Sequence, residues 1–148
     1  MLDLPKKVTD KALLEWLAPG CVIRTLVYFP DGESHFKRLI ILTAADLRTV
    51  LATIATTTPI DDHNRHYRGD DVCIAAGQEG AFERETYIQP NRVFELDIIE
   101  LQNNYNLHQL HVLGNLSADR LKNIIQKVLA SKLVERKYIQ RIRKDNGL

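Results

Sequence analysis

The sequence is poor in cysteine, in long apolar runs and in net charge, and each scarcity excludes a class of protein. Only Cys21 and Cys73 occur, so neither a disulfide framework nor a cysteine-based zinc site is expected, and both are predicted to be small apolar core residues. The uncharged stretch 49–60, rich in threonine and alanine, falls short of the ~20 apolar residues of a membrane-spanning helix. The N-terminus lacks the basic and apolar pattern of a secretory signal. We therefore expect a cytoplasmic protein with no membrane partner.

The composition that is present is typical of one soluble globular domain. Of the 148 residues, 45% are hydrophobic and 26% are charged. A domain of this size buries roughly 70% of the surface that its unfolded chain exposes. Residues 1–148 are therefore expected to form a single domain, without repeats or low-complexity segments.

The net charge of +1 is unevenly distributed along the chain. Residues 132–148 contain six basic and two acidic side chains, so this basic tail carries +4 and the rest of the chain carries −3. Such a cluster is suited to contact phosphates or an acidic partner. The charge pattern is equally consistent with a second interpretation, in which the tail is the solvated end of a helix and binds no partner.

Short segments rich in β-branched and aromatic residues follow one another through most of the chain. The predicted strands are residues 22–29, 36–43, 50–57, 72–76, 84–89, 92–96 and 107–113. Turn residues at 30–32 indicate that the first two strands form an antiparallel hairpin. Because no helices alternate with the strands, we predict a mainly β fold, a small antiparallel barrel that is closed or nearly closed.

Helices are predicted near both ends of this barrel. Thr9 is a plausible N-cap for a helix over residues 10–18, and residues 44–48 are predicted to form one helical turn. Ser117 is a second N-cap, with Leu116 placed for a hydrophobic staple. It precedes an apolar stripe at helical spacing, formed by Leu121, Ile124, Ile125, Val128 and Leu129. This C-terminal amphipathic helix is expected to cover an open face of the barrel.

Histidine pairs supply only a weak metal-binding pattern. His63 and His66 lie in a polar segment that no helix aligns. His108 and His111 would point to opposite faces of the predicted strand, so they could not share one ion. The sequence therefore predicts neither a metal site nor a cofactor.

A candidate site with defined chemistry surrounds the first hairpin. Glu33 lies in its loop, Arg38 lies early in the second strand, and Thr56 and Thr57 end the third, so these side chains are predicted to converge at one barrel edge. A guanidinium with hydroxyls is suited to hold a phosphate and to offset the charge that grows on it during transfer. Glu33 would accept a proton from a ribose 2′-hydroxyl or orient Arg38. The competing interpretation is an ordinary surface ion pair between Arg38 and Glu33.

The order of several motifs resembles that of the MazF/PemK family of toxin endoribonucleases. The resemblance spans residues 19–131 and is carried by the segments PGCVIRTLVYF, DGESHFKRLIILT, IATTTP, GQEGAFERETYIQPNRV and LGNLSADRLKNIIQKVL. It implies a small SH3-like barrel that forms homodimers and cuts single-stranded RNA at selected sequences without a metal. It also implies an antitoxin partner that wraps the dimer and blocks the RNA groove. Residues 1–18 would then be an N-terminal helical extension, and 132–148 a basic tail.

The resemblance assigns roles to individual residues. Arg38 matches the catalytic arginine, which would stabilise the transition state and act as proton donor or acceptor. Either Thr57 or Thr56 matches the catalytic threonine, and Glu33 matches a loop acid found in some members. Three further residues are candidates to line the RNA groove through stacking or phosphate contact, namely Tyr28, His35 and Arg84.

One departure from the family pattern keeps other functions open. Leu39 follows Arg38 where the family usually has proline. The alternative is a non-catalytic module that binds a nucleic acid or a protein through the same barrel. A third possibility is a subunit whose helix and tail serve only assembly.

Overall fold

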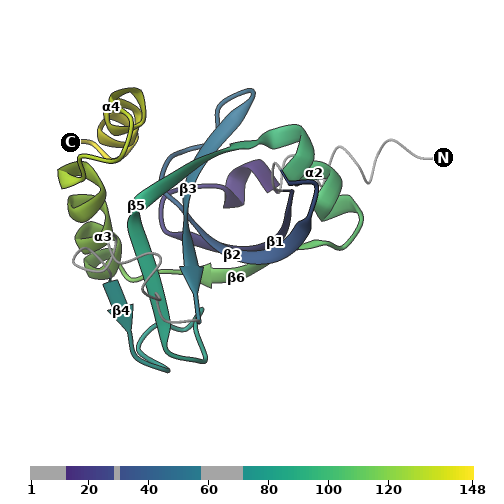
Figure 1. Cartoon of the computed structure of the whole chain (residues 1–148), viewed down its shortest axis with the longest axis horizontal. Coiled ribbons are helices and arrows are strands. Elements are labelled where there is room, and N and C mark those ends of the chain that lie inside the picture. Colours follow the sequence, from purple (N-terminus) through teal and green to yellow (C-terminus); the bar gives the residue numbers. More distant parts are fainter. Residues whose placement is uncertain (1–12, 29–30, 58–71) are drawn as a thin grey trace.

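One curled antiparallel sheet organises the molecule. The structure is a computed structural model that describes residues 13–28, 31–57 and 72–148. Within them, six strands lie in the order β4-β5-β3-β2-β1-β6, and every neighbouring pair is antiparallel. The strands are β1 (Cys21–Tyr28), β2 (Ser34–Ile41), β3 (Thr49–Thr56), β4 (Val72–Ile74), β5 (Thr86–Asp97) and β6 (Leu110–Asn115). The sheet curls into a half-barrel, as Figure 1 shows, which confirms the expected mainly β fold with helices.

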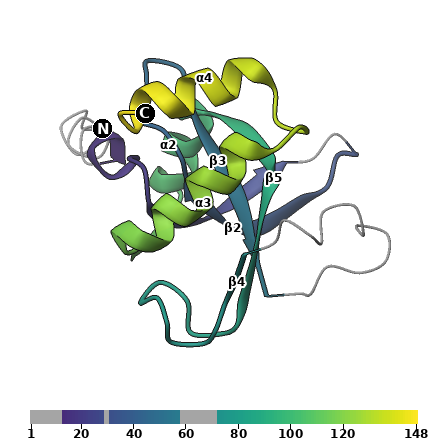
Figure 2. The ribbon, with the colours of Figure 1, turned by 90° about the vertical axis from the view of Figure 1, so that its left-hand side faces the viewer.

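The helices cover both faces of this sheet and create two cores. Helices α3 (Ala118–Ala130) and α4 (Arg136–Asp145) lie against one face, as seen in Figure 2, and α2 (Ile98–Asn106) lies on the other side. Alternate residues of β2 enter different cores, because successive side chains of a strand point to opposite faces. Ile40 packs in the α3 and α4 core, whereas Leu39 and Ile41 pack in the core on the opposite face.

Strand β5 is one continuous strand where two separate strands, 84–89 and 92–96, are predicted. It runs from Thr86 to Asp97 through Pro90. On the facing strand, Ala55 lies opposite Ile88 but Thr53 lies opposite Val93, so the register shifts around the proline. A proline has no N–H to donate to the ladder, and a bulge is where a sheet accommodates it. The Thr53 hydroxyl donates to the Gln89 carbonyl at 2.7 Å and secures this bulge.

Between residues 44 and 113 the structure differs from the prediction in three places. Helix α2 occupies residues where no helix is predicted, and it begins where Asp97 accepts hydrogen bonds from the amides of Ile99 and Glu100. It delays β6 to Leu110, so residues 107–109 are not a strand. Residues 44–48 form a non-helical loop, because the Asp46 carboxylate accepts hydrogen bonds from the Arg48 and Thr49 amides instead.

The helices predicted near the two ends of the barrel agree with the structure where it describes them. Residues 13–16 are helical, while Thr9 and residues 10–12 lie outside the described residues. Helix α3 starts as predicted, since the Ser117 hydroxyl accepts a hydrogen bond from the Arg120 amide. Leu116 and Leu121 pack in the same core, as a hydrophobic staple requires.

The basic tail is a folded element rather than a solvated end. It contains α4, whose Ile142 is fully buried and whose Tyr138 and Ile139 pack against the same core as α3. These three side chains are spaced i, i+1 and i+4, so they share one face of the helix. The charged residues occupy the remaining face.

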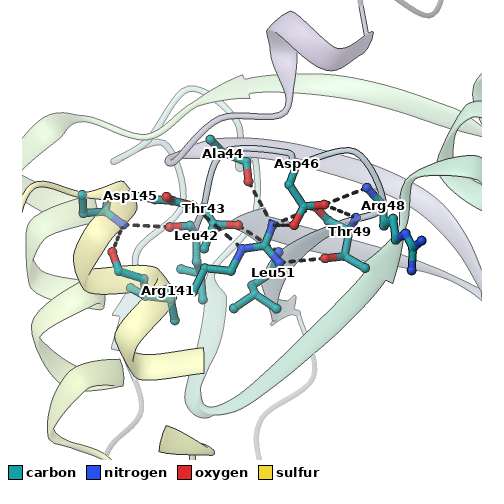
Figure 3. Close-up of polar contacts among 11 residues, drawn as sticks. Leu42, Thr43, Ala44, Asp46, Arg48, Thr49, Leu51, Arg141 and Asp145 are labelled. Atoms are coloured by element: carbon teal, nitrogen blue, oxygen red, sulfur yellow. Dashed lines mark hydrogen bonds and ion pairs between the residues drawn. The ribbon is translucent and has the colours of Figure 1, made fainter. Parts of the chain in front are cut away.

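Arg141 fastens α4 to the loop between β2 and β3. Its guanidinium donates to the Thr49 hydroxyl at 2.7 Å, to the Thr49 carbonyl at 2.8 Å and to the Ala44 carbonyl at 3.2 Å. It also lies 3.4 Å from the Asp46 carboxylate (Figure 3). One turn further on, Asn146 donates to the Leu42 carbonyl at 2.8 Å. A basic side chain of the tail is thus committed to internal contacts.

The two cysteines differ in their environment. Cys21 is buried at the start of β1, and burial raises the pKa of its thiol to about 11. Cys73 is exposed, so its prediction as a core residue is wrong. It lies on β4 between Val72 and Ile74, which are both buried, and strand alternation turns it outward.

No helix within the described residues is both long enough and apolar enough to cross a membrane.

Candidate functional site

A polar cleft brings together three of the residues singled out in the sequence. It has a volume of about 450 Å³ and lies between β2, the end of β3 and the segment that leads from β4 into β5. Arg38, Thr57 and Arg84 all line it. The remaining lining residues are Gly80, Ala81, Phe82, Glu83, Thr86 and Leu113.

Strand pairing explains how Arg38 reaches this cleft. Arg38 lies opposite Ala55 on β3, and Thr57 follows two residues later. Arg38 shares a face of β2 with Ile40, which packs in the core beneath α3. Among the described residues the half-buried Arg38 guanidinium forms no ion pair. A guanidinium in such a position is suited to bind an anion from outside.

Leu39, the residue that departs from the motif pattern by not being proline, lies on the opposite side of the strand. It is 1% exposed and packs in the second core. It pairs with Ile23 on one side and Ile54 on the other, so it occupies the middle of the sheet. The Leu39 side chain therefore does not line the cleft.

The structure distinguishes the two threonines. Thr57 lines the cleft, whereas Thr56 does not. Thr56 is the last residue of β3, is half-buried and pairs with Tyr87 of β5. Of the two candidates, Thr57 is the hydroxyl that shares the cleft with Arg38.

Glu33 lies away from the cleft, contrary to the predicted convergence. It lies between β1 and β2, and its carboxylate contacts the His35 ring at 3.1 Å. Arg38 follows Glu33 by five positions in the sequence, which corresponds to about 17 Å of extended chain. His35 is exposed beside Glu33 and does not line the cleft either.

Among the described residues that line the cleft, Glu83 is the carboxylate, and it is not predicted from the sequence. It is exposed and lines the cleft next to Arg84. Its position depends on how the segment before β5 folds back over β2, and no local pattern encodes that. The only signal in the sequence is its place beside Arg84.

A second arginine faces Arg38 from the neighbouring strand. Arg24 of β1 pairs directly with Arg38, and His111 of β6 pairs with Arg24 on its other side. Like charges directly opposite each other destabilise a sheet. No carboxylate among the described residues forms an ion pair with Arg24. A bound anion would relieve the repulsion between Arg24 and Arg38. The pairing of these two residues follows from the strand register and could not be predicted from the sequence.

Tyr28 lines a different hollow, of about 290 Å³, between the sheet and α2. The hollow is mostly apolar, and Asn104 closes one side by donating to the Thr25 hydroxyl and the Leu26 carbonyl. Its charged lining residues are Lys37, Glu95, Asp97 and Glu100. Three carboxylates against one ammonium disfavour a phosphate here.

The described residues contain no group of three or more His, Cys, Asp or Glu side chains placed to hold a metal ion. His63 and His66 lie outside these residues. His108 has a positive φ of 58° in the turn before β6, so it is not on the strand that His111 occupies.

No model of a known protein family matches this chain, and no curated protein matches it significantly. The resemblance to the MazF/PemK family therefore rests on the order of the motifs, and the function that it implies is a proposal.

Proposed function

We propose that the protein is a metal-independent endoribonuclease that cuts single-stranded RNA at selected sequences, as the toxin component of a toxin–antitoxin pair. The observation that carries this proposal is the shared cleft of Arg38, Thr57 and Arg84, in which Arg38 has no ion-pair partner among the described residues. The motif order supports the same function. An SH3-like barrel, a homodimer, an antitoxin partner and a cytoplasmic location belong to the proposal as well.

The cleft contains groups suited to cleavage by internal attack. The ribose 2′-oxygen attacks the adjacent phosphorus and loses its proton to the Glu83 carboxylate, while the bond from phosphorus to the 5′-oxygen breaks. The 5′-oxygen takes a proton from water, so the products are a 2′,3′-cyclic phosphate and a 5′-hydroxyl. Arg38 and Arg84 offset the charge that grows on the phosphate, and Thr57 donates a hydrogen bond to it. In this scheme Glu83 takes the part first considered for Glu33.

The test is cleavage of a long single-stranded RNA in the presence of EDTA. Wild-type protein should give discrete cuts with cyclic phosphate ends, and Arg38→Ala should cut at least about 100-fold more slowly, because removing one charge-stabilising donor costs this much in comparable sites. Glu83→Gln should be slow, and Glu33→Gln should cut at the wild-type rate. Circular dichroism checks that each variant is folded. An Arg38→Ala variant with wild-type activity would contradict the proposal.

The second candidate function is a module that binds RNA or a protein without cutting. The position of Glu33, about 17 Å of extended chain from Arg38, favours it, because the acid expected from the family is missing from the cleft. RNA binding without any product, combined with normal growth of cells that express the protein, would favour this alternative.

A further inference from the structure

Beside the cleft, an exposed aromatic ring lies under an arginine. Phe36 is 43% exposed, which is unusual for a large apolar side chain that has a place in a sheet. The Arg24 guanidinium lies over this ring at 4.3 Å from its centroid. A cation at this distance is attracted to the face of the ring and holds the ring in one orientation. Phe36 is therefore a fixed, partly uncovered platform.

The register connects this platform to the phosphate-binding groups. Phe36 and Arg38 are two residues apart on β2, so their side chains leave the same face of the sheet about 7 Å apart. Arg24 lies opposite Arg38 and contacts Phe36, so it links the two. One nucleotide is long enough to place its phosphate at Arg38 and a neighbouring base at Phe36.

Proteins that bind single-stranded nucleic acids commonly combine an exposed aromatic ring with neighbouring basic side chains, as Phe36, Arg24 and Arg38 do here. Basic side chains follow the backbone, and aromatic rings stack on bases that are not paired. The charge of the surface agrees with such a ligand, because Arg38 and Arg24 lie side by side on neighbouring strands.

We infer that the Phe36 ring, held by Arg24, is a base-stacking subsite that binds an unpaired nucleobase next to the phosphate at Arg38. The inference rests on the proposed function, since it names the part of the RNA that the same surface holds. It moves base recognition to Phe36 from Tyr28, which lines the mostly apolar hollow beside α2.

The test uses a fluorescently labelled 2′-O-methyl RNA of mixed sequence, which cannot be cut by internal attack, and measures its affinity by anisotropy. Phe36→Ala should weaken binding about 10-fold or more, because stacking on one aromatic ring contributes this much to affinity. Phe36→Trp should bind as the wild type does, and Phe36→Leu should resemble alanine. Leu47→Ala removes an almost fully exposed apolar side chain beyond the other end of β2, so it is the matched control and should have no effect.

A second oligonucleotide separates stacking from general loss of binding. An abasic strand of the same length offers the backbone without bases, so wild type and Phe36→Ala should bind it equally. Equal affinities of the two proteins for the base-containing strand would overturn the inference, as would a loss with Tyr28→Ala instead.

Failure of this inference is distinct from failure of the proposed function. If the wild type cuts RNA and Phe36→Ala binds normally, only the stacking subsite is refuted. If binding depends on Phe36 but unmodified RNA is never cut, the subsite stands and the nuclease proposal fails. A wild type that binds neither strand refutes both.

Discussion

Arg141 shows how one side chain secures a helix to a sheet. It is 21% exposed and donates three hydrogen bonds, one to the loop between β2 and β3 and two to Thr49 at the start of β3. We expect Arg141→Ala to lower the free energy of unfolding by about 2–3 kcal/mol, because several hydrogen bonds from a charged donor are lost together. Urea denaturation measures this loss. Arg143→Ala, at an exposed position of the same helix, should change stability by less than about 0.5 kcal/mol, and equal losses in both variants would contradict the assignment.

Asp46 makes this loop sensitive to acid. Hydrogen bonds from the Thr49 and Arg48 amides, together with the nearby Arg141 charge, hold the pKa of its carboxyl below the ordinary value. A lowered folded-state pKa stabilises the protein above about pH 4, the pKa of an unperturbed aspartate, and this contribution is lost as the pH falls through the folded-state value. The melting temperature of the wild type should therefore fall more steeply below pH 4 than that of Asp46→Asn. Parallel curves for the two proteins would show that Asp46 does not contribute.

Helix α4 is expected to be required for stability, whatever its basic face binds. Its residue Ile142 is fully buried in the core. Ile142→Ala should therefore lower the free energy of unfolding by about 2–5 kcal/mol, as for other large-to-small core changes. Gln140→Ala, at an exposed position of α4, is the control. A thermal melt that does not distinguish the two variants would refute this role for the helix.

This role changes how the charge of the tail is to be tested. Deleting residues 132–148 would remove core side chains along with the charges, so a loss of binding would have two causes. Changing four exposed residues to Gln removes charge and leaves the core side chains in place, at Arg136, Lys137, Arg143 and Lys144. The ion pair that is lost, between Lys137 and Glu135, is exposed and contributes little to stability. We expect this variant to melt within a few degrees of the wild type.

The sequence predicts elements where the signal is local. The strands β1, β2 and β3 and the start of α3 agree with the structure, because β-branched runs, a turn and an N-cap identify them. Helix α2 escapes prediction because it is short and its apolar residues follow directly on β5. Helix α4 is not predicted, because most of its residues are charged or polar. Its three apolar core residues, Tyr138, Ile139 and Ile142, give only a weak helical pattern.

The site is predictable only in part, for a related reason. Arg38 and Thr57 are found from the motif order, and both line the cleft. Glu83 and Arg24 owe their places to tertiary folding and to strand register, which one sequence does not reveal. Glu33 is near Arg38 in sequence, but an extended strand carries the two apart.

At the scale of the whole molecule, the proposed homodimer is a direct test of the family resemblance. Sedimentation velocity at micromolar concentration should show a species of twice the 16.9 kDa chain mass. A strict monomer would count against the family assignment, while leaving the cleft chemistry to be judged by RNA cleavage.

The strand order also determines when the parts of the site assemble during folding. β1, β2 and β3 are consecutive neighbours, so the pairing of Arg24 with Arg38 needs only a short loop to close. β6 pairs with β1 across most of the chain, and such non-local closure slows folding towards milliseconds or seconds. Glu83 and Arg84 reach the cleft only when β5 has joined β3. The paired guanidinium groups are therefore expected to form first, and the site acquires its acid as the sheet closes.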